Sequence, residues 1–179
     1  MRLKMKTNFQ LIPFNSEKKI KISGNLERNA NIFCLSLTFS DPEDLIKFSY
    51  SNDQSPRRAF GLWEKTCFEI FLKKLNSNEY IEFNFSADME WSCFHFDDYK
   101  EGMKDYQGAR ILELKFDQKN RTFMAKWSLD SLNGPFDCGI STIIQTKRLE
   151  KSFWALKHPN LTPDFHDFRS FVVHAPLSP

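Results

Sequence analysis

The sequence predicts an all-β protein folded as an antiparallel β-sandwich, with residues 1–179 forming a single domain. The length favours one domain, because about 150 residues per domain is the usual scale. Aromatic residues are a large part of the apolar composition, with 19 Phe, 4 Trp and 4 Tyr. Large flat side chains pack well on pleated sheets. Apolar and polar residues also alternate along many short segments separated by turn residues, which is the pattern of half-buried strands.

The strand at 32–39 shows this alternation most clearly. Phe33, Leu35, Leu37 and Phe39 fall on one face, and the Asp-Pro pair that follows ends the strand as a turn. The same pattern predicts further strands at 9–14, 20–23, 67–72, 80–85, 91–96, 111–116, 123–128, 140–146, 153–156 and 171–174. Two long connections, 45–60 and 97–108, remain between them, and long loops often carry function.

The middle of the chain reads as a three-stranded meander with two different faces. One face is apolar and is expected to be core: Phe68, Ile70, Leu72, Ile81, Phe83, Phe85, Phe94 and Phe96. The other face mixes carboxylates, an amide and aromatics: Cys67, Glu69, Phe71, Tyr80, Glu82, Asn84, Trp91, Cys93 and His95. A face of this composition is the first candidate for a binding site.

The predicted register of this meander brings two acidic residues together. A four-residue loop at 86–89 places Asn84 opposite Trp91 and Glu82 opposite Cys93. Pairing of Phe71 with Tyr80 in the first hairpin then places Glu69 opposite Glu82. Like charges directly opposite one another destabilise a sheet pair. We therefore expect a basic side chain, a bound cation, a shared proton or a hydroxyl-rich ligand to offset this repulsion.

A carbohydrate is the ligand that this mixed face suits best. Carboxylates and amides hydrogen-bond to hydroxyl groups, and aromatic rings cover the apolar patch of a sugar ring. The candidate ligand-binding residues are Arg58, Trp63, Glu69, Glu82, Asn84, Trp91, Tyr99 and His158. Three structural alternatives stay open. The face could be the wet side of an antiparallel sheet, Trp63 could pack at the strand entrance, and Tyr99 could anchor its loop.

Four groups of residues, in the same order, resemble motifs of bacterial DOMON-like domain proteins. LWEKTCFEIFL at 62–72 resembles that family's LWexTCFExF, and YIEFNFS at 80–86 matches its Y-x-EFN-x-S. FDDYKEGM at 96–103 resembles F-x-x-Y-R-x-GM, while FWALKHP at 153–159 with PDFH at 163–166 resembles YWAL-x-HP and PDFH. Together the motifs extend over about two thirds of the chain.

This resemblance implies a fold and two ligand classes. The family is similar to family-9 carbohydrate-binding modules and to DOMON domains, β-sandwiches of immunoglobulin-like or jelly-roll type that bind sugars or haem. It therefore adds a haem-binding alternative, with Met103 and either His158 or His166 as iron ligands. The sequence departs from the family where Lys100 replaces the usual Arg. It departs again where SADM at 86–89 replaces the usual SPSG turn, which should alter that hairpin.

Charge and composition argue against several other functions. The net charge of +2 supplies no basic stripe for nucleic acid. No segment approaches the roughly 18 apolar residues of a membrane span, and the first residues lack the apolar stretch of a signal peptide, so a cytoplasmic protein is expected. There, the widely spaced Cys34, Cys67, Cys93 and Cys138 are expected to be free thiols.

No catalytic centre is recognisable in the sequence. Glu69 and Glu82 are comparable with the carboxyl pair of a retaining glycosidase, but nothing marks either as the acid. Asp97, Asp98 and Glu101 form an acidic loop that could hold calcium, although EF-hand spacing is absent. We therefore expect a non-catalytic binding domain for a carbohydrate or similar polar ligand. The rival prediction is a structural or protein-interaction domain, acting as a homodimer or with a protein partner.

Overall fold

A computed structural model describes residues 4–175 and confirms an all-β protein. The strands are β1 (Lys4–Pro13), β2 (Lys21–Asn29), β3 (Ile32–Ser40), β4 (Arg57–Arg58), β5 (Cys67–Lys74), β6 (Tyr80–Phe85), β7 (Glu90–Phe96), β8 (Lys104–Asp105), β9 (Ala109–Asp117), β10 (Thr122–Leu129), β11 (Phe136–Gln145), β12 (Lys151–Ala155) and β13 (Val173–Ala175). Helical structure within residues 4–175 consists of the short 3-10 turns η1 (Leu62–Glu64) and η2 (Phe168–Ser170). No helix in this range is long and apolar enough to span a membrane.

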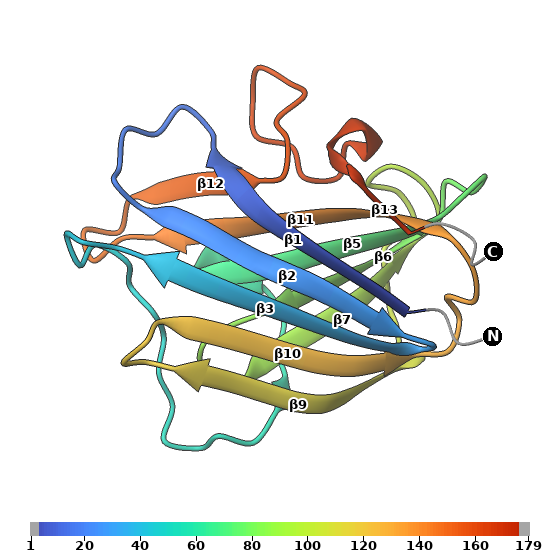
Figure 1. Ribbon diagram of the computed structural model, residues 1–179, viewed down its shortest axis with the longest axis horizontal. Helices are drawn as coiled ribbons and strands as arrows, with labels where there is room; N and C mark the ends of the chain where they lie inside the picture. The colour runs from blue at the N-terminus through green and yellow to red at the C-terminus, as the bar shows by residue number, and fades with distance from the viewer. Residues whose placement is uncertain (1–3, 176–179) are drawn as a thin grey trace.

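The strands form one curled sheet in the shape of a half-barrel, in the order β4-β7-β6-β5-β11-β12-β1-β2-β3-β10-β9 (Figure 1). β13 pairs with β11 and β8 pairs with β7. The long strand β1 joins the two halves, because its first part pairs with β2 and its last two residues pair with β12. The prediction of an antiparallel β-sandwich is therefore confirmed only as far as the all-β class. The sheet is continuous, and it is mixed because β4 runs parallel to β7.

Curling encloses an aromatic core on the inner face of the sheet. Phe68 on β5 lies 4.6 Å from Phe123 on β10, and Phe83 on β6 lies 5.1 Å from Trp127 on β10, measured between ring centroids. Strands from opposite ends of the sheet thus face each other across the core, as in Figure 1. Aromatic side chains bury large apolar areas, so these contacts between distant strands stabilise the curl.

All the predicted strands are present, and most are longer than predicted. β2 continues to Asn29 and β1 begins at Lys4, through polar residues that the alternation pattern did not reveal. The two-residue strands β4 and β8 were missed because they lie in the long connections and pair only with β7. The four cysteines are free, as predicted.

The hairpin between β6 and β7 differs from its predicted register by one residue. Phe85 lies opposite Trp91, and the loop is the three-residue stretch from Ala87 to Met89. Met89 has a φ of 65°, which is typical of the last loop residue in a three-residue hairpin. A shift of one residue moves every side chain of a strand to the other face. Trp91 and Cys93 therefore point into the inner core, contrary to the prediction.

The register of the first hairpin also differs from the prediction. Phe71 lies opposite Glu82, and Glu69 lies opposite Asn84. The two glutamates are therefore diagonal neighbours on the outer face and not a directly opposed pair. Diagonal positions on neighbouring strands are still within reach of long side chains.

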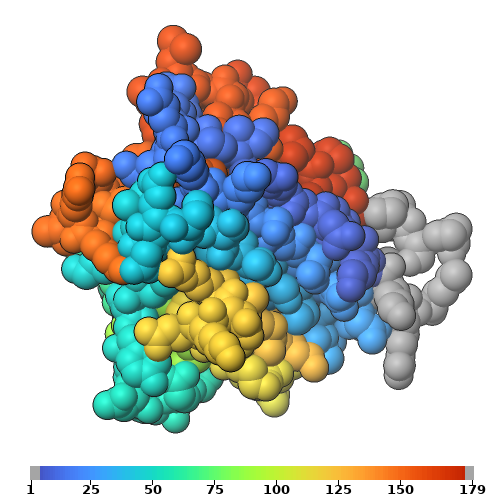
Figure 2. All heavy atoms as spheres, turned by 60° about the vertical axis from the view of Figure 1, so that its left-hand side comes forward, coloured from blue at the N-terminus to red at the C-terminus, as the bar shows by residue number. Residues whose placement is uncertain are grey.

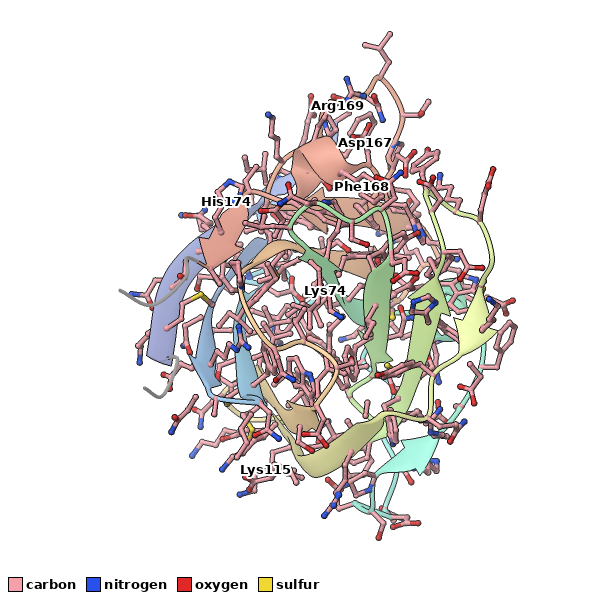
Figure 3. All side chains as sticks on the ribbon, turned by 90° about the vertical axis from the view of Figure 1, so that its right-hand side faces the viewer. Lys74, Lys115, Asp167, Phe168, Arg169 and His174 are labelled. Carbon is pink, nitrogen blue, oxygen red and sulfur yellow. The ribbon has the colours of Figure 1, made fainter. Side chains whose placement is uncertain are left out.

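The outer face of β5–β7 is covered by a segment near the C-terminus, residues 157–171, here called the cover segment. Phe165, Phe168 and Phe171 of this segment pack against apolar side chains of the outer face. Figure 3 shows Phe168 nearer the sheet than its neighbours Asp167 and Arg169. Phe94 and Phe96, which were predicted to be inner core residues, are instead buried on the outer face beneath this cover.

Candidate functional site

Two rows of side chains cross the outer face from β11 to β7. One row contains Ser141, Glu69, Asn84 and Ser92, and the next contains Gly139, Phe71, Glu82 and Phe94. Each strand contributes one residue to each row because alternate residues of a strand share a face. The two glutamates therefore lie on adjacent strands and in adjacent rows.

A cavity of about 340 Å³ lies between these rows and the cover segment. Its walls are formed by Trp63, Glu69, Glu82, Phe96, Lys100, Met103, Ile143, Phe153, Pro163, Asp164, Phe165 and His166. Glu69 is only 4% exposed and Glu82 only 6%. Both carboxyl groups are thus almost withdrawn from bulk water and line a partly open cavity with several aromatic wall residues.

Each carboxyl has one polar side-chain partner from the sheet. Ser141 Oγ donates to Glu69 Oε2 over 2.7 Å, and Asn84 Nδ2 donates to Glu82 Oε1 over 2.7 Å. Cys67 Sγ in turn donates to Asn84 Oδ1 over 3.5 Å. Within residues 4–175, no Lys or Arg forms an ion pair with either glutamate.

Burial without a cation changes the protonation of this pair. Burial raises the pKa of Glu69 to about 8, with the neighbouring Glu82 charge as the second cause. Burial likewise raises the pKa of Glu82 to about 7. Low-dielectric surroundings disfavour the charged form of a carboxyl group. Of the four solutions that the sequence left open, the structure therefore favours protons held by the pair.

His166 extends the polar network from the cover segment. Its Nδ1 lies 2.7 Å from the Tyr80 hydroxyl, and that hydroxyl accepts the Lys100 backbone N–H over 3.3 Å. Burial and then the Lys100 charge lower the pKa of His166 to about 4, so its ring is neutral at pH 7. The other ring nitrogen, Nε2, lies 3.9 Å from Glu82 Oε2.

Polar contacts at the rim hold the cover segment over the cavity. Lys100 Nζ lies 3.0 Å from Asp164 Oδ1, and the Tyr99 hydroxyl donates to the other oxygen of the same carboxylate. Asp164 also accepts the His166 backbone N–H over 3.1 Å. The loop that carries Tyr99 and Lys100 is thereby connected to the part of the cover segment that carries His166.

The structure brings together only some of the predicted ligand-binding residues. Trp63, Glu69 and Glu82 line the cavity. Asn84 is buried and donates a hydrogen bond to Glu82. Tyr99 is exposed at the rim. Sequence reasoning placed Tyr80 on the same face but did not include it among the ligand-binding residues, and it missed Ser141 and the aromatic walls from Phe153 and Phe165. The sequence predicted His166 as an iron ligand or, in the structural alternative, as part of the 164–166 stretch that holds the C-terminal loop onto the strand at 63–69.

The other predicted residues lie elsewhere. Trp91 is buried on the inner face, with the Arg58 guanidinium 4.2 Å from its ring centroid. Arg58 also donates to Asp105 over 2.7 Å. His158 Nε2 is 2.8 Å from the Ile12 carbonyl oxygen, and its ring packs edge-on against Phe14. His158 thus connects the cover segment to β1 and does not face the cavity.

The residues proposed for haem do not fit that group. The His166 ring is enclosed by Phe71, Tyr80 and Phe96, its Nδ1 is hydrogen-bonded, and its Nε2 faces the Glu82 carboxyl. An iron atom at Nε2 would compete for the position of that carboxyl. Met103 is an exposed side chain at the cavity mouth.

Two carboxylates of the acidic loop proposed for calcium bind neighbouring side chains. Asp97 pairs with Lys104 over 2.8 Å, and Asp98 accepts the Asn78 amide over 3.0 Å. Among the residues that the structure describes, no group of three or more His, Cys, Asp and Glu side chains is arranged to hold a metal ion.

The protonation of the glutamate pair bears on its comparison with a retaining glycosidase. A retaining glycosidase needs one protonated carboxyl and one ionised carboxylate as the nucleophile. The pKa values of Glu69 and Glu82 are both raised by burial. Between pH 7 and 8 such a pair holds about one proton, so protonation alone does not decide against this role.

A wider hollow of about 850 Å³ lies between residues 14–18, 43–45 and 146–153, and shares the wall residue Phe153 with the glutamate cavity. Figure 2 shows these blue, cyan and orange segments meeting on one face. Several of its charged side chains pair with each other, as Lys18 does with Glu150 over 2.9 Å and Lys147 with Asp44. We therefore place the candidate site at the glutamate cavity.

Comparison with known proteins supports the fold alone. No protein-family model and no curated protein matches the sequence. The crystal structure of a "putative carbohydrate-binding protein" from Bacteroides uniformis ATCC 8492 is similar, with a TM-score of 0.63 over 92% of this chain and 84% of that one. The two sequences are 12% identical, so the likeness shows a shared all-β architecture. The resemblance to DOMON-like proteins stays a prediction from the sequence motifs.

Proposed function

We propose that the protein binds a small, neutral, polyhydroxylated ligand of the carbohydrate class in the glutamate cavity. The observation that carries the proposal is the pair Glu69 and Glu82, which is buried without a Lys or Arg partner in residues 4–175 and lines the cavity. A protonated carboxyl both donates and accepts a hydrogen bond, as a sugar hydroxyl does. In its protonated form the pair is therefore complementary to hydroxyl groups.

The shape and walls of the cavity support the same ligand class. Trp63, Phe96, Phe153 and Phe165 provide aromatic surface around the two carboxyls, and ring faces pack against the C–H patches of sugars. A volume of about 340 Å³ lies at the small end of ligand pockets. A single monosaccharide ring is the appropriate size.

Two further features agree with this proposal. The structural neighbour from B. uniformis is named for carbohydrate binding, and the sequence motifs resemble DOMON-like proteins, which are related to carbohydrate-binding modules. We extend both to this chain as parts of the proposal. The rival is a structural or interaction domain, favoured by the role of His158 in connecting the cover segment to β1.

A titration with neutral monosaccharides separates these functions. A sugar at 100 times its dissociation constant adds about 2.7 kcal/mol to stability, which is roughly 5–10 °C in Tm for a domain of this size. We expect a shift of this order for one or more sugars at ~10 mM. Glu82→Gln should keep affinity within about tenfold, because glutamine is also a neutral donor and acceptor. Glu82→Leu should lose binding.

The matched control is Glu113→Leu, a glutamate on β9 paired only with Lys115. This variant should bind sugar as the unchanged protein does. The absence of a shift with every monosaccharide, or equal shifts in Glu82→Leu and Glu113→Leu, would refute the proposed site and favour the structural role.

A further inference from the structure

A second cavity, of about 540 Å³, adjoins the glutamate cavity. It is lined by Arg58, Ala59, Phe60, Ser92, Phe94, Met103 and Asp105. Met103 lines both cavities. The two hollows therefore lie next to each other, with an exposed and flexible side chain at their junction.

Ser92 is the buried polar group of this second cavity. It stands in the same row as Glu69 and Asn84, one strand further along, and it is only 4% exposed. Its hydroxyl has no hydrogen-bond partner within residues 4–175. A buried hydroxyl without a partner costs stability, so its presence on a cavity wall points to a partner supplied by a ligand.

Phe60 provides an unusually exposed aromatic surface at the same place. Its side chain is 74% exposed, although it sits among other rings. Trp63 and Phe94 hold it edge-on, with ring centroids 5.0 Å and 5.9 Å away. A ring fixed in orientation but left open to solvent is the arrangement expected of a stacking surface.

The charged residues of this cavity leave it without net charge. Arg58 donates to Asp105 over 2.7 Å and to the Tyr106 carbonyl over 2.8 Å. Its guanidinium also lies over the Trp91 ring. The pairing with Asp105 cancels the charge, which favours a neutral occupant over a phosphate or a carboxylate.

We propose that this cavity is a second subsite, which takes the second ring of a disaccharide whose first ring occupies the glutamate cavity. The inference rests on the proposed function. The second ring stacks on Phe60, and one of its hydroxyl groups hydrogen-bonds to Ser92 Oγ. The protein thus selects ligands of at least two sugar rings over single rings.

Calorimetric titration with pairs of sugars tests this selection. The probes are glucose, galactose, mannose and xylose, together with disaccharides composed of the same units. For the sugar that binds, we expect the disaccharide to bind about tenfold or more tightly than the monosaccharide. Phe60→Ala and Ser92→Ala should remove this gain and leave monosaccharide affinity unchanged. Both should fold, because Phe60 is exposed and Ser92→Ala removes only an unpartnered hydroxyl.

The control is Tyr50→Ala, which removes an exposed aromatic ring from another loop and should keep the gain. Monosaccharide binding without any gain for the disaccharide, or a gain that survives in Phe60→Ala and Ser92→Ala, overturns the second subsite while the glutamate site stands. Absence of binding by every sugar overturns both proposals.

Discussion

The double variant Glu69→Gln/Glu82→Gln is expected to be more stable than the unchanged protein at pH 8.5, and to lose most of the pH dependence of unfolding above pH 6.5. Burial raises the pKa of Glu82 to about 7 and that of Glu69 to about 8. In the unfolded chain both groups return to ordinary carboxyl values near 4.5. Glutamine keeps the shape and polarity of the protonated side chain without an ionisable group.

The sign of the effect follows from proton binding. Between the unfolded and folded pKa values the folded protein binds more protons, so the free energy of unfolding falls as pH rises and levels off above each folded pKa. One pKa unit corresponds to about 1.4 kcal/mol. The loss between pH 6.5 and pH 8.5 is therefore about 3 kcal/mol for the pair, or roughly 6–12 °C in Tm. Below pH 6.5 the lowered pKa of His166 acts in the opposite direction.

Urea denaturation at several values between pH 6.5 and pH 8.5 measures this effect. The matched control is the double variant Glu113→Gln/Glu150→Gln, whose carboxyls are paired with surface lysines and have lowered pKa values. It should keep the pH dependence of the unchanged protein. A flat profile in the unchanged protein would show that the glutamates are ionised as ordinary carboxylates and would also remove the basis for a neutral sugar site.

The faces on which these glutamates lie could be predicted from the sequence, but the register between their strands could not. Alternation along β5 and β6 correctly placed Glu69, Glu82 and Asn84 on one face, because each strand's own period fixes its faces. The register between strands depends on the turns. Met89 adopts a left-handed backbone conformation, and nothing in its side chain predicts this. The resulting three-residue loop turned Trp91 inward and brought Phe94 to the outer face.

Burial on both faces explains the remaining difference. A half-buried strand shows one apolar and one polar face, but β6 and β7 have apolar residues on both faces because the cover segment lies over the outer one. The alternation of side chains along β6 and β7 therefore could not show which face of the sheet was the inner core. The cover segment itself has no regular pattern. Its link to the site through His166, Tyr80 and Lys100 is a tertiary contact that appears only in the folded structure.

The second large effect, a loss of stability, is expected for Phe171→Ala, because Phe171 belongs to the cover segment that buries the glutamates. Phe171 is buried against the Phe71 ring at 5.6 Å and the Phe168 ring at 5.6 Å. It also fills the space above Gly139, where even a Cβ atom would lie 2.5 Å from the Phe171 ring. Truncation of a buried Phe costs about 3–5 kcal/mol. Because this Phe anchors the cover segment, the variant should also admit water to the glutamate cavity.

Access of water should return the pKa values of Glu69 and Glu82 towards the ordinary range, because burial is the main cause of both shifts. Phe171→Ala should therefore be less stable at every pH, yet nearly independent of pH between 6.5 and 8.5. The matched control is Phe123→Ala, which removes an equally buried ring from the inner core. It should lose a similar free energy of unfolding and keep the full pH dependence. If both variants keep that dependence, the cover segment is not what separates the glutamates from water, and the cavity is closed by the sheet and η1 alone.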